Sequence, residues 1–349
     1  MGMVQHYPAM NPPVAPVCSI CIANYNGEEL LPDCLESILA QQGDFSVEII
    51  VHDDASTDNS LTLLRQHYPQ VEVLASTKNV GFSIGNNRMA AHARGKYILL
   101  LNNDAALYPD ALATLLNAAH SQAHPGIQTL PQYDWISGDL VDRGCLLDPF
   151  YNPVPNLDPE RRDVAMVIGA CLFIPRTLWG SLGGFPAWLE SIGEDLYLCC
   201  LARLRGVSVQ VSAGSGYRHR QGASFGGNRV SKGKLHTNLR RRQLSERNKT
   251  FALFVLTPGI VVWPLLAIHL ATLLVEGLLL SMLKPTVHVW SGIYRPAIAA
   301  PIRYWAILRA KRTEAQNTRH AGWWKYMSTT RFWPRKLQLL KNYGLPHID

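Results

Sequence analysis

The chain has 349 residues, of which 47% are hydrophobic and 17% charged, with a net charge of +7. This composition excludes an intrinsically disordered or fibrous protein and leaves room for a large core. The charge is uneven, because residues 250–349 hold 12 Lys and Arg against 3 Asp and Glu, whereas residues 1–249 carry a net −2. We predict a nearly neutral globular part and a basic tail that favours an anionic surface as its partner.

The first 16 residues are rich in proline and lack the apolar stretch of a signal peptide, so we expect a flexible arm. The seven cysteines lie mostly inside apolar runs, which favours buried, reduced thiols. Cys18 and Cys21 have C-x-x-C spacing, but no second pair follows at zinc-ribbon spacing.

Short apolar runs alternate with helical patterns from residue 17 onward. Strands are predicted at residues 17–23, 47–51, 71–75 and 97–101, and helices at residues 29–41, at 58–67, up to 93 and from 109. Four alternations predict a mostly parallel α/β sheet flanked by helices. After a looser Pro- and Asp-rich stretch, further strands are expected at 164–175 and 207–213, with a helix at 195–205 between them.

Acidic residues gather in the polar segments that interrupt or follow these elements. "HDDASTD" supplies Asp53 and Asp54, "LNNDA" supplies Asp104, and "SIGEDLYL" supplies Glu194 and Asp195. Ligands bind at the carboxyl ends of strands in such sheets, and carboxylates gathered there repel one another unless a cation is bound. Magnesium bound by one or two carboxylates plus substrate phosphates fits this pattern. The alternative is that residues 102–104 only cap the next helix.

These motifs, in this order, resemble family 2 glycosyltransferases with the GT-A fold, and "NVGFSIGNN" is similar to a stretch common in the rhamnosyltransferase-like branch. The resemblance covers residues 17–249. It implies a nucleotide-sugar-binding part at 17–125 and an acceptor and catalytic part at 126–249. Residues 250–349 lie outside it.

The resemblance also implies roles for individual residues. Asp195 would be the general base of an inverting transfer, with Glu194 orienting it; the alternative is an acidic pair that favours the dipole of its helix. Asp104 and His219 would bind Mg²⁺ or Mn²⁺, although Asn102 stands where a strict D-x-D motif has its first acid. The residues expected to contact the nucleotide sugar are Ala23, Tyr25, Asn26, Asp53, Asp54, Asn79, Gly81, Asn87 and Asn103.

The tail contains an apolar segment at residues 251–283, interrupted by Pro258 and Pro264 and bearing one acid, Glu276. It exceeds the roughly 20 residues that a membrane span needs, yet both of its flanks are basic. We predict hydrophobic and amphipathic helices attached to the cytoplasmic face of the inner or plasma membrane by a monotopic or re-entrant segment. A core helix of a larger soluble domain is the alternative.

We therefore expect an inverting, metal-dependent hexosyl- or rhamnosyltransferase of cell-surface polysaccharide biosynthesis. Its donor would be a UDP- or dTDP-sugar and its acceptor a hydroxyl of a lipid-linked saccharide. A catalytically degenerate domain that serves as a membrane scaffold is the second hypothesis. Nucleic acid is not expected as a partner, because the aromatic residues of the tail accompany long apolar runs.

Overall fold

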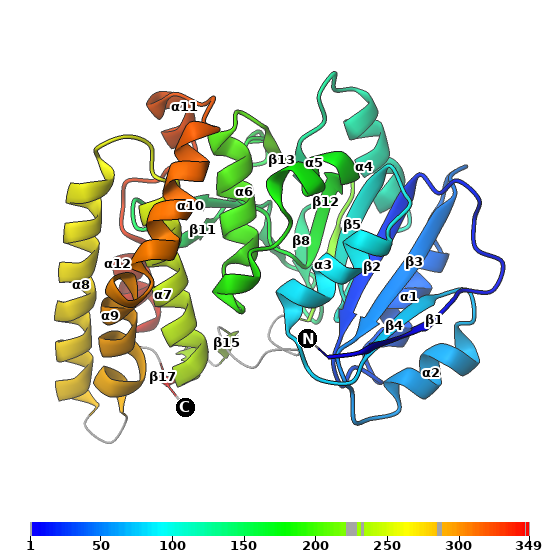
Figure 1. Cartoon of the computed structure of the whole chain (residues 1–349), viewed down its shortest axis with the longest axis horizontal. Helices are drawn as coiled ribbons and strands as arrows, with labels where there is room; N and C mark the ends of the chain where they lie inside the picture. Colours follow the sequence, from blue (N-terminus) through cyan, green and yellow to red (C-terminus); the bar gives the residue numbers. More distant parts are fainter. Residues whose placement is uncertain (1, 221–228, 232–233, 285–287, 346, 349) are drawn as a thin grey trace. The chain divides into compact units, whose positions relative to one another are not determined.

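The computed structural model describes residues 2–220, 229–231, 234–284, 288–345 and 347–348. By their internal contacts the residues divide into two compact units. The first comprises residues 1–145, 155–198 and 208–224, and the second comprises 146–154, 199–207 and 225–349. Figure 1 shows the elements of both units.

The first unit is a mixed α/β structure built on a large sheet. Its strands are β1 (Val4–Tyr7), β2 (Cys18–Asn24), β3 (Val47–Asp53), β4 (Glu72–Ser76), β5 (Tyr97–Asn102), β6 (Ala105–Leu107), β7 (Ile127–Thr129), β8 (Gln132–Asp134), β9 (Leu140–Asp142), β10 (Cys145–Leu147), β11 (Pro153–Pro155), β12 (Cys171–Pro175), β13 (Val209–Val211) and β14 (Tyr217–His219), of which β10 and β11 cross into the second unit. Its helices are α1 (Leu31–Leu39), α2 (Ser60–His67), α3 (Phe82–His92), α4 (Ala111–His120), α5 (Arg176–Leu182), a 3₁₀ turn at Ala187–Leu189 and the start of α6 (Glu194–Leu204).

Within the described residues the large sheet has eight strands in the order β1-β4-β3-β2-β5-β12-β7-β13. Strands β4, β3, β2 and β5 are mutually parallel, as predicted, whereas β1 and β12 run antiparallel to their neighbours. A smaller sheet has the order β6-β14-β8-β9. The predicted strand–helix alternation between residues 17 and 120 is confirmed, with one additional short strand, β6, that was not predicted.

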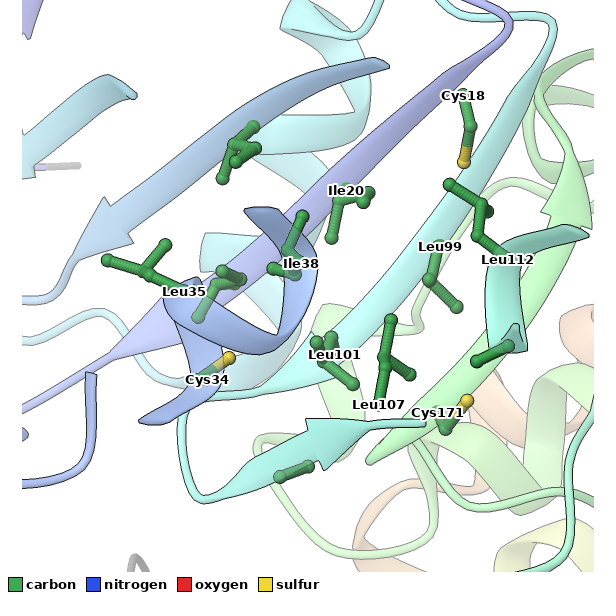
Figure 2. Packing of buried hydrophobic residues seen from close by; sticks show 14 of the residues in the cluster. Cys18, Ile20, Cys34, Leu35, Ile38, Leu99, Leu101, Leu107, Leu112 and Cys171 are labelled. Atoms are coloured by element: carbon green, nitrogen blue, oxygen red, sulfur yellow. The ribbon is translucent and has the colours of Figure 1, made fainter. Parts of the chain in front are cut away.

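The main core lies between one face of the large sheet and helices α1, α2 and α4. Alternate residues of β2, such as Ile20, point to this face together with Leu99 and Leu101 of β5. Figure 2 shows Leu35 and Ile38 of α1 lying over the same strands. Burial of this apolar surface is the main favourable term for the fold, at roughly 25 cal/mol per Å².

Helix α3 covers the opposite face of the sheet. His52 follows Val51 in β3 and therefore points away from the main core, since successive strand residues alternate between faces. A Cβ atom at Gly85 of α3 would lie only 2.9 Å from His52 Nδ1, so the absence of a side chain at residue 85 lets the helix approach the strand.

The structure differs from the sequence expectation at the N-terminal arm. Val4–Tyr7 form strand β1, paired antiparallel with β4 so that His6 lies opposite Leu74. The segment has no apolar run that would announce a strand. It is recruited because the edge of β4 offers unpaired backbone groups.

The second unit is mainly helical. Its elements are α7 (Leu239–Leu256), α8 (Val262–Leu283), a π-helical turn (Trp290–Tyr294), α9 (Arg295–Arg303), α10 (Trp305–Asn317), α11 (Trp323–Met327), α12 (Arg335–Tyr343) and the short strands β15 (Arg229–Ser231), β16 (Lys234–Thr237) and β17 (His347–Ile348). Helix α7 runs through the predicted domain boundary at residue 249, because its basic first half and apolar second half form one continuous helix.

The apolar tail segment is interrupted once rather than twice. Pro258 lies in the turn between α7 and α8, as a helix breaker should. Pro264 lies in the first turn of α8, where its missing N–H would have had no partner within the helix, so the expectation of a second break is wrong. Among the described residues, α8 alone is long and apolar enough to cross a bilayer, a test that buried helices also pass.

Candidate active site

Three neighbouring strands of the large sheet end at the same edge. In the parallel register Asn24 of β2 pairs with Asp53 of β3, and Ala23 pairs with Asn102 of β5. The polar residues that stop these strands are therefore brought together by strand pairing alone. This is the edge at which open α/β sheets bind ligands.

A line of buried hydrogen bonds crosses this edge. Asn24 Nδ2 donates to Asp53 Oδ2 (3.0 Å), and Asn103 Nδ2 donates to Asn24 Oδ1 (2.8 Å). Asp53 also accepts from the backbone N–H of Ser56 (3.1 Å) and from its hydroxyl (2.6 Å). Asn24, Asp53 and Asn103 are all at most 3% exposed, so each polar group is satisfied by its neighbours.

Gly27 lies against this line. A Cβ atom there would meet Asn24 Oδ1 at 2.2 Å and Asn103 Nδ2 at 2.3 Å. Only glycine allows the loop after β2 to pass so close to the amide pair. The sequence analysis did not single out Asn24 or Gly27, although Asn24 directly follows the predicted first strand.

Asp54 fixes a second loop. Its carboxylate accepts the backbone N–H groups of Val80 (2.7 Å) and Gly81 (2.8 Å). Gly81 has φ +86°, in the region that favours glycine, and stands immediately before α3. Asp54 thus holds the loop of residues 77–81 against the end of β3.

Asp104 meets His219 across the smaller sheet. Antiparallel pairing of β14 with β6 sets His219 opposite Ala105, and His219 Nε2 lies 3.1 Å from Asp104 Oδ1. Both side chains are buried. The alternative that Asp104 caps the next helix is wrong, because β6 intervenes and α4 begins only at Ala111.

His219 is oriented by a residue that the sequence did not indicate. Its Nδ1 lies 3.4 Å from Oε1 of Gln132, an oxygen that also accepts the Tyr217 hydroxyl (2.8 Å). In the tautomer with the proton on Nδ1, His219 donates to this oxygen and the lone pair of Nε2 faces the Asp104 carboxylate. The Nδ2 atom of Asn102 lies 3.5 Å from the same Nε2.

This donor set fits a divalent cation. Two neighbouring ligands of an octahedral ion at about 2.1 Å lie about 3.0 Å apart, close to the 3.1 Å between His219 Nε2 and Asp104 Oδ1. In that tautomer two acceptor atoms face each other, and a cation between them would satisfy both. The hydrogen bond on the far nitrogen is the usual companion of a metal-binding histidine.

Asp195 stands in the first turn of α6 beside the backbone of residue 169. Its Oδ2 accepts the N–H of Gly169 (3.1 Å) and its Oδ1 that of Leu196 (2.7 Å). The residue after Gly169, Ala170, accepts the backbone N–H of Asn102 (3.1 Å). Asp195 is partly exposed, whereas its neighbour Glu194 is buried. Asp195 is therefore held close to the end of β5 yet open to solvent.

The other residues predicted to contact the nucleotide sugar differ in exposure and in hydrogen bonding. Tyr25 is 50% exposed and free to stack on a flat ligand, while Asn26 Oδ1 accepts the N–H of Thr57 (2.7 Å). Ala23 is half-buried and Asn79 exposed. Both ends of the Asn87 amide bind the backbone of Phe185, at 2.8 and 2.9 Å, so in this structure Asn87 holds that loop. Donor contact by Asn87 stays a prediction.

Part of the chain is similar to known proteins. Residues 19–143 match the family model described as glycosyl transferase family 2. This segment of the chain is therefore similar to a family 2 glycosyltransferase domain.

Two curated relatives share this region. Poly(ribitol-phosphate) beta-glucosyltransferase of Bacillus spizizenii is 31% identical over 207 residues, which are 57% of this chain and 31% of the relative. Chondroitin synthase of Escherichia coli is 37% identical over 188 residues, which are 52% of this chain and 26% of the relative. The chain thus spans less than a third of the length of these two proteins.

Solved structures give the same fold. The mannosyltransferase PcManGT from Pyrobaculum calidifontis, in complex with GDP-Man and Mn²⁺, matches with a TM-score of 0.50 and 18% identity over 88% of each chain. S. aureus TarS 1–349 in complex with UDP matches with a TM-score of 0.51 and 16% identity, over 86% of this chain and 88% of that one. The predicted GT-A fold class is confirmed.

The site generates a prediction about Asp142, the last residue of β9. Burial raises the pKa of this carboxyl from 3.8 to about 6, although it accepts the N–H of Gly144. As the pH rises, the unfolded chain therefore loses this proton before the folded one does. The free energy of unfolding falls as the pH rises from about 3.8 to about 6. Asp142→Asn, which keeps an acceptor oxygen, should remove that fall and raise the free energy of unfolding by up to about 3 kcal/mol at pH 7.

Melting temperatures recorded from pH 4 to pH 7 measure the effect. Asp139→Asn, an exposed change beside the same strand, serves as the control and should follow the parent. Parallel curves for Asp142→Asn and the parent would contradict the assignment.

Proposed function

We propose that this chain is an inverting glycosyltransferase that transfers a hexosyl or rhamnosyl group from a UDP- or dTDP-sugar to a hydroxyl of a lipid-linked saccharide. The observation that carries the proposal is the contact of Asp104 with His219 at the carboxyl edge of the sheet. At the same edge Asn102 donates its backbone N–H to Ala170, and the neighbouring Gly169 donates its own to Asp195. Names of relatives that act on polysaccharides support the pathway.

The residues of the site divide the chemistry between them. Asp195 would take the proton of the acceptor hydroxyl as its oxygen attacks the anomeric carbon and the bond to the diphosphate oxygen breaks. Mg²⁺ or Mn²⁺, held by Asp104 and His219, would neutralise the charge of the leaving diphosphate. Tyr25 would stack on the base, and the loop that Asp54 holds would approach the donor through backbone groups. Attack from the face opposite the leaving group inverts the anomeric carbon.

The second hypothesis, a degenerate scaffold, is less well supported. A domain that had lost catalysis would not need a buried imidazole beside a carboxylate at the ligand-binding edge of the sheet. Here the pair is kept together with its orienting residue, Gln132.

The metal role of Asp104 and His219 can be tested by conservative changes. Asp104→Asn and His219→Gln should each lower turnover of UDP- and dTDP-sugars at least about 100-fold, because each removes one ligand of the cation. They should also abolish the Mn²⁺ dependence of UDP binding, measured by calorimetry. Asp139→Asn is the control. Near-parental turnover in both variants would show that the cation binds elsewhere.

The general-base role of Asp195 requires a different signature. Asp195→Asn keeps an oxygen for the Gly169 N–H, so UDP affinity with Mn²⁺ should stay within about 2-fold of the parent. Turnover should fall by at least about 10², the usual range for loss of a general base. Loss of UDP binding would indicate a structural role, and a product of retained configuration, seen by NMR, would exclude single displacement.

We also propose attachment to the cytoplasmic face of a membrane through the second unit. Helix α8 exposes most of its large apolar residues and turns its ionisable ones, His269 and Glu276, inward, the reverse of a soluble surface helix. Glu276 pairs with Arg242 (2.7 Å) and Lys336 (2.6 Å), and His269 is buried. The exposed large hydrophobic residues of α8 are Trp263, Ile268, Leu274, Val275, Leu278, Leu279, Met282 and Leu283. An apolar patch of this kind fits a bilayer interface.

A monotopic arrangement suits this helix better than a crossing. One stripe of α8, including Leu273, Gly277 and Leu280, is buried within the unit and so is withdrawn from lipid. Arg295, Arg303 and Arg309 lie exposed on the following helices, where anionic lipid would attract each by about 1 kcal/mol.

Fractionation tests the attachment. Detergent should release the protein from membranes fully, whereas high salt should release only part of it, because apolar burial outweighs the screened charges. The double change Val275→Glu and Leu279→Glu on the exposed face of α8 should shift the protein to the soluble fraction, and Ala310→Glu on α10 should not. Accessibility of a C-terminal reporter from outside the cell would mean a true crossing.

A further inference from the structure

A second group of metal-ligating side chains lies beside the edge strand β1 of the large sheet. His6 Nε2 is 2.9 Å from Glu72 Oε1, and His92 Nδ1 is 3.3 Å from the same oxygen. The three ligand atoms all lie within 4.8 Å of one another. The two imidazole side chains are 46% and 44% exposed, and that of Glu72 is 14% exposed.

The fold brings the three residues together from distant parts of the sequence. His6 lies opposite Leu74 in the β1–β4 pair, so Glu72, two residues from Leu74, is its diagonal neighbour on the same face of the sheet. His92 ends helix α3, the helix that covers the face of His52. The cluster thus joins the edge strand β1, the amino end of β4 and the last turn of α3.

We propose that His6, Glu72 and His92 form a binding site for Zn²⁺ that fastens the N-terminal strand to the sheet. Two imidazole nitrogens and one carboxylate oxygen are a zinc donor set, and a solvent molecule completes four-coordination. Two ligands of a tetrahedral ion at about 2.1 Å lie about 3.4 Å apart, against 2.9 and 3.3 Å for the two pairs that share the Glu72 oxygen. Small rotations of half-exposed side chains close the difference.

Zinc would lie between the two rings and the Glu72 oxygen. Each neutral ring would bind the ion through the nitrogen that faces Glu72 and carry its single proton on the other nitrogen, so no redox step or co-reactant is involved. The ion would clip residue 6 to residue 72, which are 66 positions apart, and so stabilise β1 in the folded state.

Zinc titration of the full-length chain tests the site. The experiment uses an Asp104→Ala background, freed of metal by chelation, so that the Asp104–His219 pair contributes nothing. We expect one equivalent of Zn²⁺ by calorimetry and a rise in melting temperature, with Co²⁺ giving the intense visible absorption of a tetrahedral site. His6→Ala and His92→Ala should each weaken zinc binding at least about 100-fold, more than loss of a ligand's hydrogen-bond partner would.

His67→Ala is the matched control, because His67 is an exposed histidine in the last turn of α2 and should leave zinc affinity unchanged. Glu72→Gln keeps the shape of the cluster and should weaken binding at least about 10-fold even if a histidine variant fails to fold. No uptake of Zn²⁺ at micromolar concentration, or equal uptake by His6→Ala, His92→Ala and the parent, would overturn the proposal.

Discussion

The carboxyl edge of the large sheet depends on one constraint: amides and carboxylates buried there have to satisfy one another. Asn24 is the centre of this arrangement, because it donates to Asp53 and accepts from Asn103. Removing one partner would leave a buried polar group unsatisfied, at a cost of about 1–3 kcal/mol. Parallel register fixes the positions of all three, and Gly27 passes over them without a side chain. The loops that surround the candidate donor site start from this rigid base.

The acids that stand out in the sequence therefore have different tasks. Asp53 and Asp54 are occupied by hydrogen bonds that hold their own loops. Asp104 instead faces an imidazole, and Asp195 keeps partial exposure at the start of a helix. Carboxylates that look equivalent in the sequence thus differ in role because their oxygens have different contacts. Rigid loops and reactive groups are both needed, because a site has to hold its geometry to bind and react.

In the second unit, too, buried polar groups satisfy one another, but here the partners are charged. Glu246 of α7 lies within 3.1 Å of Arg242, Lys249 and Lys336. Burial raises the pKa of this carboxyl, and the three cations outweigh that effect and hold it well below its ordinary value. Buried charges are tolerable only when paired in this way. Because the charges are gathered inside, the outer surface of α8 can remain apolar.

The sequence by itself determined the alternation of strands and helices, the ends of the strands that carry Asp53 and Asp104, and the start of the helix at Asp195. These follow from local periodicity and from polar residues that stop apolar runs. Strand β1 was missed because its pairing partner, not its own pattern, makes it a strand.

Only the tertiary structure decided which oxygens are occupied, as at Asp54 and Asn87, and which groups meet from afar, as His219 with Gln132 or His6 with His92. The physical reason is that such contacts depend on strand register and helix packing between residues far apart in the chain. The composition of a short segment does not show which distant residues it will meet.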